Sequence, residues 1–254
     1  MLTLYSDCSR SGQNDGVTVV SGWLSSGELW LGFESDWAAV LQRFDVPYFH
    51  MKEYAHSTGA FETGWKGEND KRRRFIEALL AVIDQYALAS FASMIEGNAF
   101  DEVNLEFQVR EYFGTEFAIC ARLCIAETNR WMREHGYEPP AEYVFEDGDP
   151  RGRLTWLLES IRYPPPIYKP SRDRAAKDGT LIRGLLPLQA ADFAAYELRK
   201  NWDDVGDITD PSELERYRKS FLGIGRVSKG EGFWGNCTAD DLRQMCKDLR
   251  VERR

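Results

Sequence analysis

The chain has 254 residues, 43% of them hydrophobic, and a formal net charge of −9. This length and apolar content can form one sizeable core, so we expect a large domain over 1–202 and a C-terminal helical extension, 203–254, packed on it. The acidic charge argues against a generally basic nucleic-acid-binding surface. Local basic runs nevertheless occur at Lys71–Arg74 and between Lys169 and Arg183.

The N-terminus has no basic stretch followed by an apolar core, and no segment approaches about 18 uninterrupted apolar residues. We therefore expect a cytoplasmic protein with no membrane partner. The five cysteines are an odd number and contain no Cys-x-x-Cys pair, so the sequence predicts neither a disulfide framework nor a zinc site.

Strand signals open the chain. Residues 2–6 predict a strand, the polar segment 9–16 a turn, and the β-branched run 17–20 a second strand. A turn at Gly27 and Glu28 followed by an apolar run at 29–31 predicts a third strand, and so an antiparallel meander.

Helical and strand-like segments alternate through the rest of the chain. We expect helices over 35–44, 70–84, 102–135 and 150–162, one opened by Pro187, and short ones near 211–221 and 238–249, with strands over 86–95 and 143–145. The segment 163–180 holds four prolines and predicts a long surface loop. A meander followed by such alternation indicates an α/β or α+β domain with a mixed sheet flanked by helices.

Asp192 is the polar residue that local structure explains least, because it stands alone in the apolar run Ala190–Ala195. Burying a carboxylate is unfavourable unless a partner compensates its charge. A favourable helix-dipole contact is the structural alternative, but a helix starting near Pro187 places Asp192 beyond the first turn. The strongest partner would be a divalent cation shared with other carboxylates, and helical spacing puts Gln189 and Tyr196 on the same side.

Other carboxylates follow the predicted strands. Asp7 comes after the first strand, where it serves either as a ligand or as a residue that stabilises the turn. Glu146, Asp147 and Asp149 come after the strand 143–145, and such clustered acids repel one another unless they are solvated, paired or bound to a cation. Asp149 could instead cap the next helix, whereas Glu146 is favoured as a ligand because it ends the strand.

Several other residues are candidates for auxiliary roles. His50 serves either as a proton shuttle or phosphate contact, or as a structural histidine among aromatic residues. Glu96, at the end of a strand, is either a further ligand or a solvated loop acid. A basic loop that leads into the Asp192 helix would suit a phosphodiester backbone, with Tyr163 and Tyr168 available for stacking. Its basic residues are Lys169, Arg172, Arg174, Lys177 and Arg183.

Four segments together resemble the family called domain of unknown function 3800, found in bacteria and on phage-related elements. They are Tyr5–Ser9, Phe49–His50, Phe145–Asp147 and Leu188–Tyr196. The resemblance implies a ribonuclease H-like mixed sheet, with three antiparallel strands joined to parallel ones and with helical insertions. It also implies that Asp7, Glu146 and Asp192 bind one or two Mg²⁺ or Mn²⁺ ions, with His50 in an auxiliary role.

The function that this resemblance implies is a metal-dependent nuclease, or another phosphodiester hydrolase, that acts on RNA or DNA. The acidic net charge and Cys8 favour the alternative of a catalytically inactive nucleic-acid or protein-interaction module, and two positions depart from the family pattern. Cys8 stands where the family has a second acid, and Glu146 stands where aspartate is usual. A thiol is a poor ligand for Mg²⁺.

Overall fold

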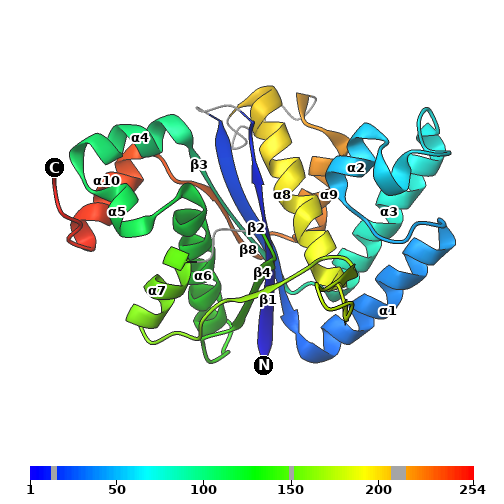
Figure 1. Ribbon diagram of the computed structural model, residues 1–254, viewed down its shortest axis with the longest axis horizontal. Coiled ribbons are helices and arrows are strands. Elements are labelled where there is room, and N and C mark those ends of the chain that lie inside the picture. Colours follow the sequence, from blue (N-terminus) through cyan, green and yellow to red (C-terminus); the bar gives the residue numbers. More distant parts are fainter. Residues whose placement is uncertain (13–15, 149–151, 207–215) are drawn as a thin grey trace.

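The computed structural model describes residues 1–12, 16–148, 152–206 and 216–254. These residues form a mixed six-stranded sheet with the order β5-β4-β1-β2-β3-β8 (Figure 1). Its strands are β1 (Leu2–Arg10), β2 (Val17–Ser26), β3 (Ala89–Glu96), β4 (Glu142–Glu146), β5 (Ile167–Lys169) and β8 (Gly232–Asn236). The pairs β1–β2 and β2–β3 are antiparallel, whereas β1–β4, β4–β5 and β3–β8 are parallel. A separate antiparallel hairpin joins β6 (Arg174–Ala175) to β7 (Leu181–Ile182).

Helices cover both faces of the sheet (Figure 1). On one face lie α1 (Gly27–Arg43), α2 (Met51–His56), α3 (Asn69–Tyr86), α8 (Leu186–Val205) and α9 (Lys219–Val227), with a short 3-10 turn at Gly59–Phe61. On the other lie α4 (Gly97–Glu106), α5 (Val109–Phe113), α6 (Glu116–Glu134), α7 (Gly152–Ser160) and α10 (Ala239–Asp248). The predicted α/β class, with a mixed sheet between helices, is confirmed. In the described part of the chain, every helix is too short or too polar to span a membrane.

The predicted third strand at 29–31 is wrong, because these residues belong to helix α1. The Ser26 side chain caps this helix by accepting a hydrogen bond from the backbone N–H of Leu29 at 3.3 Å. Four residues at helical spacing then bury one side of α1, namely Trp30, Phe33, Trp37 and Leu41. The third antiparallel strand is β3, which follows a long helical excursion.

Three other predicted elements differ from the structure. The helix expected over 102–135 is divided into α4, α5 and α6, and Gly114 ends α5 with a φ of +85°. The loop 163–180 contains β5, which extends the sheet beside β4. The C-terminal segment, expected to be helical, also supplies β8 at the opposite edge, and its helix near 211–221 is α9, farther along. Residues 211–215 of that prediction lie outside the described residues.

The core has one part on each side of the sheet. Helix α6 buries the predicted face, which comprises Phe117, Ala121, Cys124, Ile125, Thr128 and Trp131. On the other side, aromatic residues of α1 and α3 pack beneath α8. Helix α8 is held close to the sheet where Trp23 donates a hydrogen bond from Nε1 to the carbonyl oxygen of Ala190 at 3.1 Å. All five cysteines are free thiols, in agreement with the prediction.

Candidate active site between strand β1 and helix α8

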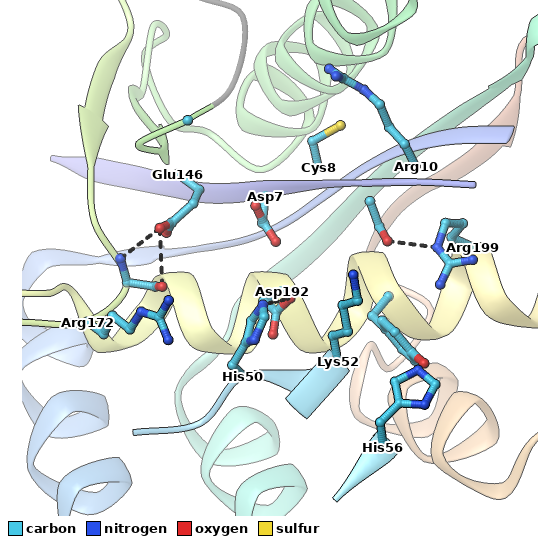
Figure 2. Close-up of a pocket in the computed structure, with 14 residues that line it drawn as sticks. Asp7, Cys8, Arg10, His50, Lys52, His56, Glu146, Arg172, Asp192 and Arg199 are labelled. Carbon is cyan, nitrogen blue, oxygen red and sulfur yellow. Dashed lines mark hydrogen bonds and ion pairs between the residues drawn. The ribbon is translucent and has the colours of Figure 1, made fainter. Parts of the chain in front are cut away.

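An open cavity of about 420 Å³ lies between the sheet and helix α8 (Figure 2). Four of the predicted site residues line it, although they come from β1, the start of α2, β4 and α8: Asp7, His50, Glu146 and Asp192. Figure 2 shows Asp7 and Glu146 directed from the sheet toward the helix that carries Asp192. The fifth predicted residue, Asp149, lies outside the described residues.

The pairing of β1 with β4 brings Asp7 beside Glu146. In this parallel pair Ser6 is opposite Phe145, so the next step along both strands pairs Asp7 with Glu146. Neighbouring strands lie roughly 4.8 Å apart, and residues in register project from the same face. Asp7 was expected just beyond its strand, but β1 continues to Arg10, so Asp7 is a buried strand residue and not a turn residue.

Glu146 is a carboxylate with one satisfied and one unsatisfied oxygen. Its Oε1 accepts hydrogen bonds from the backbone N–H and the hydroxyl of Ser171, at 3.1 and 3.2 Å. Its Oε2 is buried and has no hydrogen-bond partner. Burial raises the pKa of Glu146 to about 7, the bonds from Ser171 oppose this rise, and the charge of Asp192 adds to it. This carboxylate therefore gains from a proton or a cation at neutral pH.

Asp192 is held by the residues that begin helix α2. Its Oδ2 accepts a hydrogen bond from the backbone N–H of Met51 at 2.6 Å, and its Oδ1 lies 3.9 Å from Nε2 of His50. The Nδ1 of the same ring lies 3.4 Å from Oε1 of Glu53, so the imidazole stands between two carboxylates. Burial raises the pKa of Asp192, whereas His50 and the Met51 N–H oppose that rise. The side chain is only 15% exposed.

His50 is fixed in place by its neighbour Phe49, which is buried in the aromatic core. The Phe49 ring makes edge contacts with Trp37, Phe75 and Phe193, with centroids 5.5 to 6.1 Å apart. The aromatic flank noted in the sequence is therefore structural, while His50 itself faces the cavity. The auxiliary role of His50 stays a prediction, and its position at the cavity is compatible with it.

Gln189 links three segments around the cavity. It is buried, and its Oε1 accepts hydrogen bonds at 3.0 Å from Nε1 of Trp37 and from the backbone N–H of Phe49. Its Nε2 donates to the carbonyl oxygen of Ser171 at 2.8 Å. Ser171 and Phe49 are the immediate supports of Glu146 and His50, so this one amide positions two walls of the site. The sequence placed Gln189 beside Asp192 without indicating these contacts.

Replacing Gln189 with alanine is expected to lower the free energy of unfolding by about 3 kcal/mol, because buried donors on Trp37 and Phe49 lose their acceptor. Urea denaturation of the two proteins measures the difference. The control is Gln244→Ala on α10, an exposed residue whose replacement should change stability by less than about 0.5 kcal/mol. A loss of similar size in both variants would show that Gln189 does not brace the site.

Cys8 follows Asp7 in β1, and the alternation of a strand turns its side chain to the opposite face. Figure 2 shows this divergence, and the thiol packs partly against the core beneath α6. The departure from the family pattern at Cys8 therefore concerns a side chain directed away from Asp192. Cys8 is half-buried and is also among the residues that line the cavity.

Two other acids from the sequence analysis do not join the site. Asp147 forms an ion pair with Arg174, and its backbone N–H donates to the carbonyl oxygen of Lys169 at 2.9 Å. Glu96 lies at the end of β3 and lines a different cavity, together with Asp203 and Asp204. Among the predicted basic loop residues, Arg172 lines the site, whereas Arg183 pairs with Asp173.

Among the described residues, four Lys and Arg side chains also line the cavity, and the sequence had pointed to only one of them, Arg172. The other three are Arg10, Lys52 and Arg199. Arg199 donates from Nε to the hydroxyl of Ser9 at 2.9 Å, and Arg172 lies 3.1 Å from Glu53. Because strand and helix register bring these residues together from distant segments, no local pattern could have identified them.

The donor set at this cavity suits a hard divalent cation, since it consists of carboxylate oxygens. The unpaired Oε2 of Glu146 is the observation that fits a cation best, because a buried oxygen without a donor is unfavourable. Within the described residues, no three His, Cys, Asp or Glu side chains lie close enough together to hold a metal ion as they stand. Binding would therefore require the three carboxylates to draw together around the ion.

No protein-family model matches the chain, and no curated protein is significantly similar to it.

Proposed function

We propose that the protein is a metal-dependent nuclease or phosphodiesterase of ribonuclease H-like fold that hydrolyses RNA or DNA with Mg²⁺ or Mn²⁺. The observation that carries this proposal is the convergence of Asp7, Glu146 and Asp192 on one cavity, where an oxygen of Glu146 lacks a partner. The order of these acids along the chain agrees with the resemblance to the domain of unknown function 3800 family.

The residues of the cavity divide into two groups with different tasks. Asp7, Glu146 and Asp192 would hold the cation through carboxylate oxygens. A bound divalent cation would activate a water molecule and stabilise the leaving oxygen of a phosphodiester. His50 lies within 3.9 Å of Asp192 and is 38% exposed, so it can exchange a proton between the site and solvent.

The basic side chains favour a phosphodiester over other substrates of metal-dependent hydrolases. Lys52, Arg172 and Arg199 line the cavity beside the carboxylates on a chain whose net charge is −9, whereas Arg10 extends from β1 on the same side as Cys8 (Figure 2). Lys52 is exposed and forms no ion pair with any residue that the structure describes. Such a side chain is available to contact a phosphate that flanks a scissile bond.

The second candidate function is a non-catalytic nucleic-acid or protein-interaction module with the same fold. It is favoured by the lack, in the described residues, of a preassembled group of metal ligands. In such a protein Glu146 would keep its proton near neutral pH and the cavity would bind a partner without hydrolysis.

A cleavage assay separates these two functions. End-labelled single- and double-stranded RNA and DNA are incubated with the protein in Mn²⁺, in Mg²⁺ and in chelator. The nuclease proposal expects products in at least one cation and none in chelator. An absence of cleavage of all four substrates in both cations would contradict it and favour the interaction module.

A further inference from the structure

A second cavity adjoins the carboxylate cavity, with a volume of about 780 Å³. The two share His56 and Tyr196 in their walls, so they lie side by side along helix α8. The second cavity lies among α2, α3, α8 and α9, and we call it the basic groove. Its basic lining residues are Arg72, Arg73, Lys200, Arg218, Lys219 and Arg226.

The groove concentrates positive charge on an acidic protein. Six Lys and Arg side chains line it, whereas Glu77 is the one Asp or Glu among its described lining residues. Two of the six, Lys219 and Arg226, are exposed on α9 and form no ion pair with a described residue. A local excess of cations against a net charge of −9 indicates an anionic occupant.

Arg72 is held in the groove by uncharged partners. Its guanidinium donates to the carbonyl oxygen of Tyr54 at 2.8 Å and to the hydroxyl of Ser57 at 3.1 Å, and it lies 4.1 Å from the centroid of the Tyr54 ring. All three partners are neutral, so its charge is not cancelled by a described carboxylate. A half-buried guanidinium whose position is fixed in this way, and whose charge is not compensated by a described carboxylate, can bind a phosphate.

Three other cations of the groove are paired with carboxylates. Arg218 lies 2.8 Å from the buried Glu197, Arg73 lies 3.3 Å from Glu77, and Lys200 pairs with Asp204. These pairs reduce the net charge but leave Arg72, Lys219 and Arg226 uncompensated by described residues. The anion-binding capacity therefore comes from Arg72 on α3 and from Lys219 and Arg226 on α9.

The groove also offers apolar surface, which a simple phosphate site would not need. Met51, Ile76, Leu80 and Leu222 line it beside the cations, and the exposed ring of His56 stands at the junction with the carboxylate cavity. Basic grooves that alternate with apolar or aromatic surface are typical of sites for single-stranded nucleic acid. The volume falls in the range of sites for one small ligand, about 300–1,000 Å³, which suits about one or two nucleotides and not a duplex.

We propose that the basic groove binds the part of a single-stranded polynucleotide that extends beyond the phosphate at the carboxylates, with Arg72, Lys219 and Arg226 contacting its backbone. The polynucleotide nature of the occupant rests on the function proposed above. The binding of a chain-like polyanion does not, because it is inferred from the positive charge of the groove and from the adjacency of the two cavities.

Fluorescence anisotropy with labelled oligouridylates and oligothymidylates of about 4 and about 12 nucleotides tests the groove, in chelator so that nothing is cleaved. The longer probe of at least one type is expected to bind about tenfold or more tightly than the shorter one. The double variant Lys219→Glu, Arg226→Glu should weaken binding of the longer probe about tenfold or more. It should also reduce the slope of log affinity against log salt by about 1.4, the value for two lost phosphate contacts on a single strand.

The matched control changes the same charge on the opposite face of the sheet. Arg133→Glu, Lys247→Glu alters two exposed residues of α6 and α10 that form no ion pair with a described residue. Its affinity for the longer probe should fall less than about twofold, since remote charges are screened over about 10 Å at moderate salt. Equal losses of affinity in both double variants, or equal affinity for both probe lengths, would contradict the proposal that the basic groove binds a polynucleotide.

The two proposals fail in different ways. Bis(4-nitrophenyl) phosphate is too short to reach the groove from the carboxylates, so its Mn²⁺-dependent hydrolysis by the wild-type protein tests the carboxylate site alone. If that hydrolysis is absent while binding still depends on probe length, the nuclease proposal is refuted and the proposal for the basic groove stands. If hydrolysis occurs while binding does not depend on probe length, the proposal for the basic groove is refuted and the nuclease proposal stands.

Discussion

Replacing Asp192 with asparagine is expected to lower cation-dependent cleavage by about 10³-fold or more and to leave the fold intact. Asparagine has the same shape, and its side-chain oxygen can still accept the hydrogen bond from the Met51 N–H. The substitution removes the negative charge that a cation would need. Because burial raises the pKa of Asp192, the neutral amide should not destabilise the metal-free protein.

The measurement is the initial rate of cleavage in Mn²⁺, together with a thermal unfolding curve in chelator. A suitable control is Asp36→Asn on α1, a half-buried carboxylate that accepts a hydrogen bond from the Tyr86 hydroxyl at 2.7 Å. That variant should cleave at the wild-type rate, since Asp36 does not line the cavity. Wild-type rates in Asp192→Asn would remove Asp192 from the catalytic site.

The part of this site that local sequence patterns could predict is the part that lies on regular elements. Helical spacing placed Asp192 on a helix opened by Pro187, and the end of a strand signal placed Glu146 at the end of its strand. Both positions depend only on periodicities of 3.6 and 2 residues. Their meeting with Asp7 was implied by the resemblance to the domain of unknown function 3800 family, and the structure brings all three to one cavity.

The unpredicted part depends on contacts between distant segments. Ser171 lies in a loop that its prolines marked only as irregular, yet it donates two hydrogen bonds to Glu146. The apolar run at 29–31 fits a strand as well as a helix, and the hydrogen bond of the Ser26 cap stabilises the helix. Strand β8 is separated from its partner β3 by more than a hundred residues, so no local pattern could pair them.

The same limit applies to the basic residues. The sequence presented Lys71–Arg74 as a run on one helix, for which a solvated face is the ordinary expectation. In the fold Lys71 lies over Trp65, with Nζ 4.1 Å from the ring centroid, whereas Arg72 lines the groove. Neighbours in a charge run thus have separate environments, because successive helical residues point about 100° apart.

Glu146 is expected to make the metal-free protein less stable as the pH rises from about 4.5 to about 7. Burial raises the pKa of this carboxyl from its ordinary value of 4.5 to about 7. The folded state therefore binds the proton more tightly than the unfolded state, and the stability from this proton is complete below pH 4.5 and lost as the pH passes about 7. Partial solvent access reduces the effect to roughly 2 kcal/mol.

The variant Glu146→Gln isolates this contribution. From pH 5 to pH 8, the free energy of unfolding of the wild type should fall relative to that of the variant by roughly 2 kcal/mol. Urea denaturation of both proteins in chelator measures this change. Glu142→Gln makes the same substitution at the other end of β4, outside the cavity, and should keep the wild-type pH dependence. A wild-type pH dependence in Glu146→Gln would contradict the assignment.

Mn²⁺ and the proton should compete for Glu146, and this competition connects the stability measurement to the function. At a concentration of 100 times its dissociation constant, the ion would stabilise the fold by about 2.7 kcal/mol, or about 5–10 °C in Tm. The shift should be larger at pH 8 than at pH 5, because deprotonated carboxylates bind cations, and it should largely disappear in Glu146→Gln. An equal Mn²⁺ response in both proteins would exclude Glu146 as a ligand, and its unpaired oxygen would then belong to a protonated acid in a site that binds without hydrolysing.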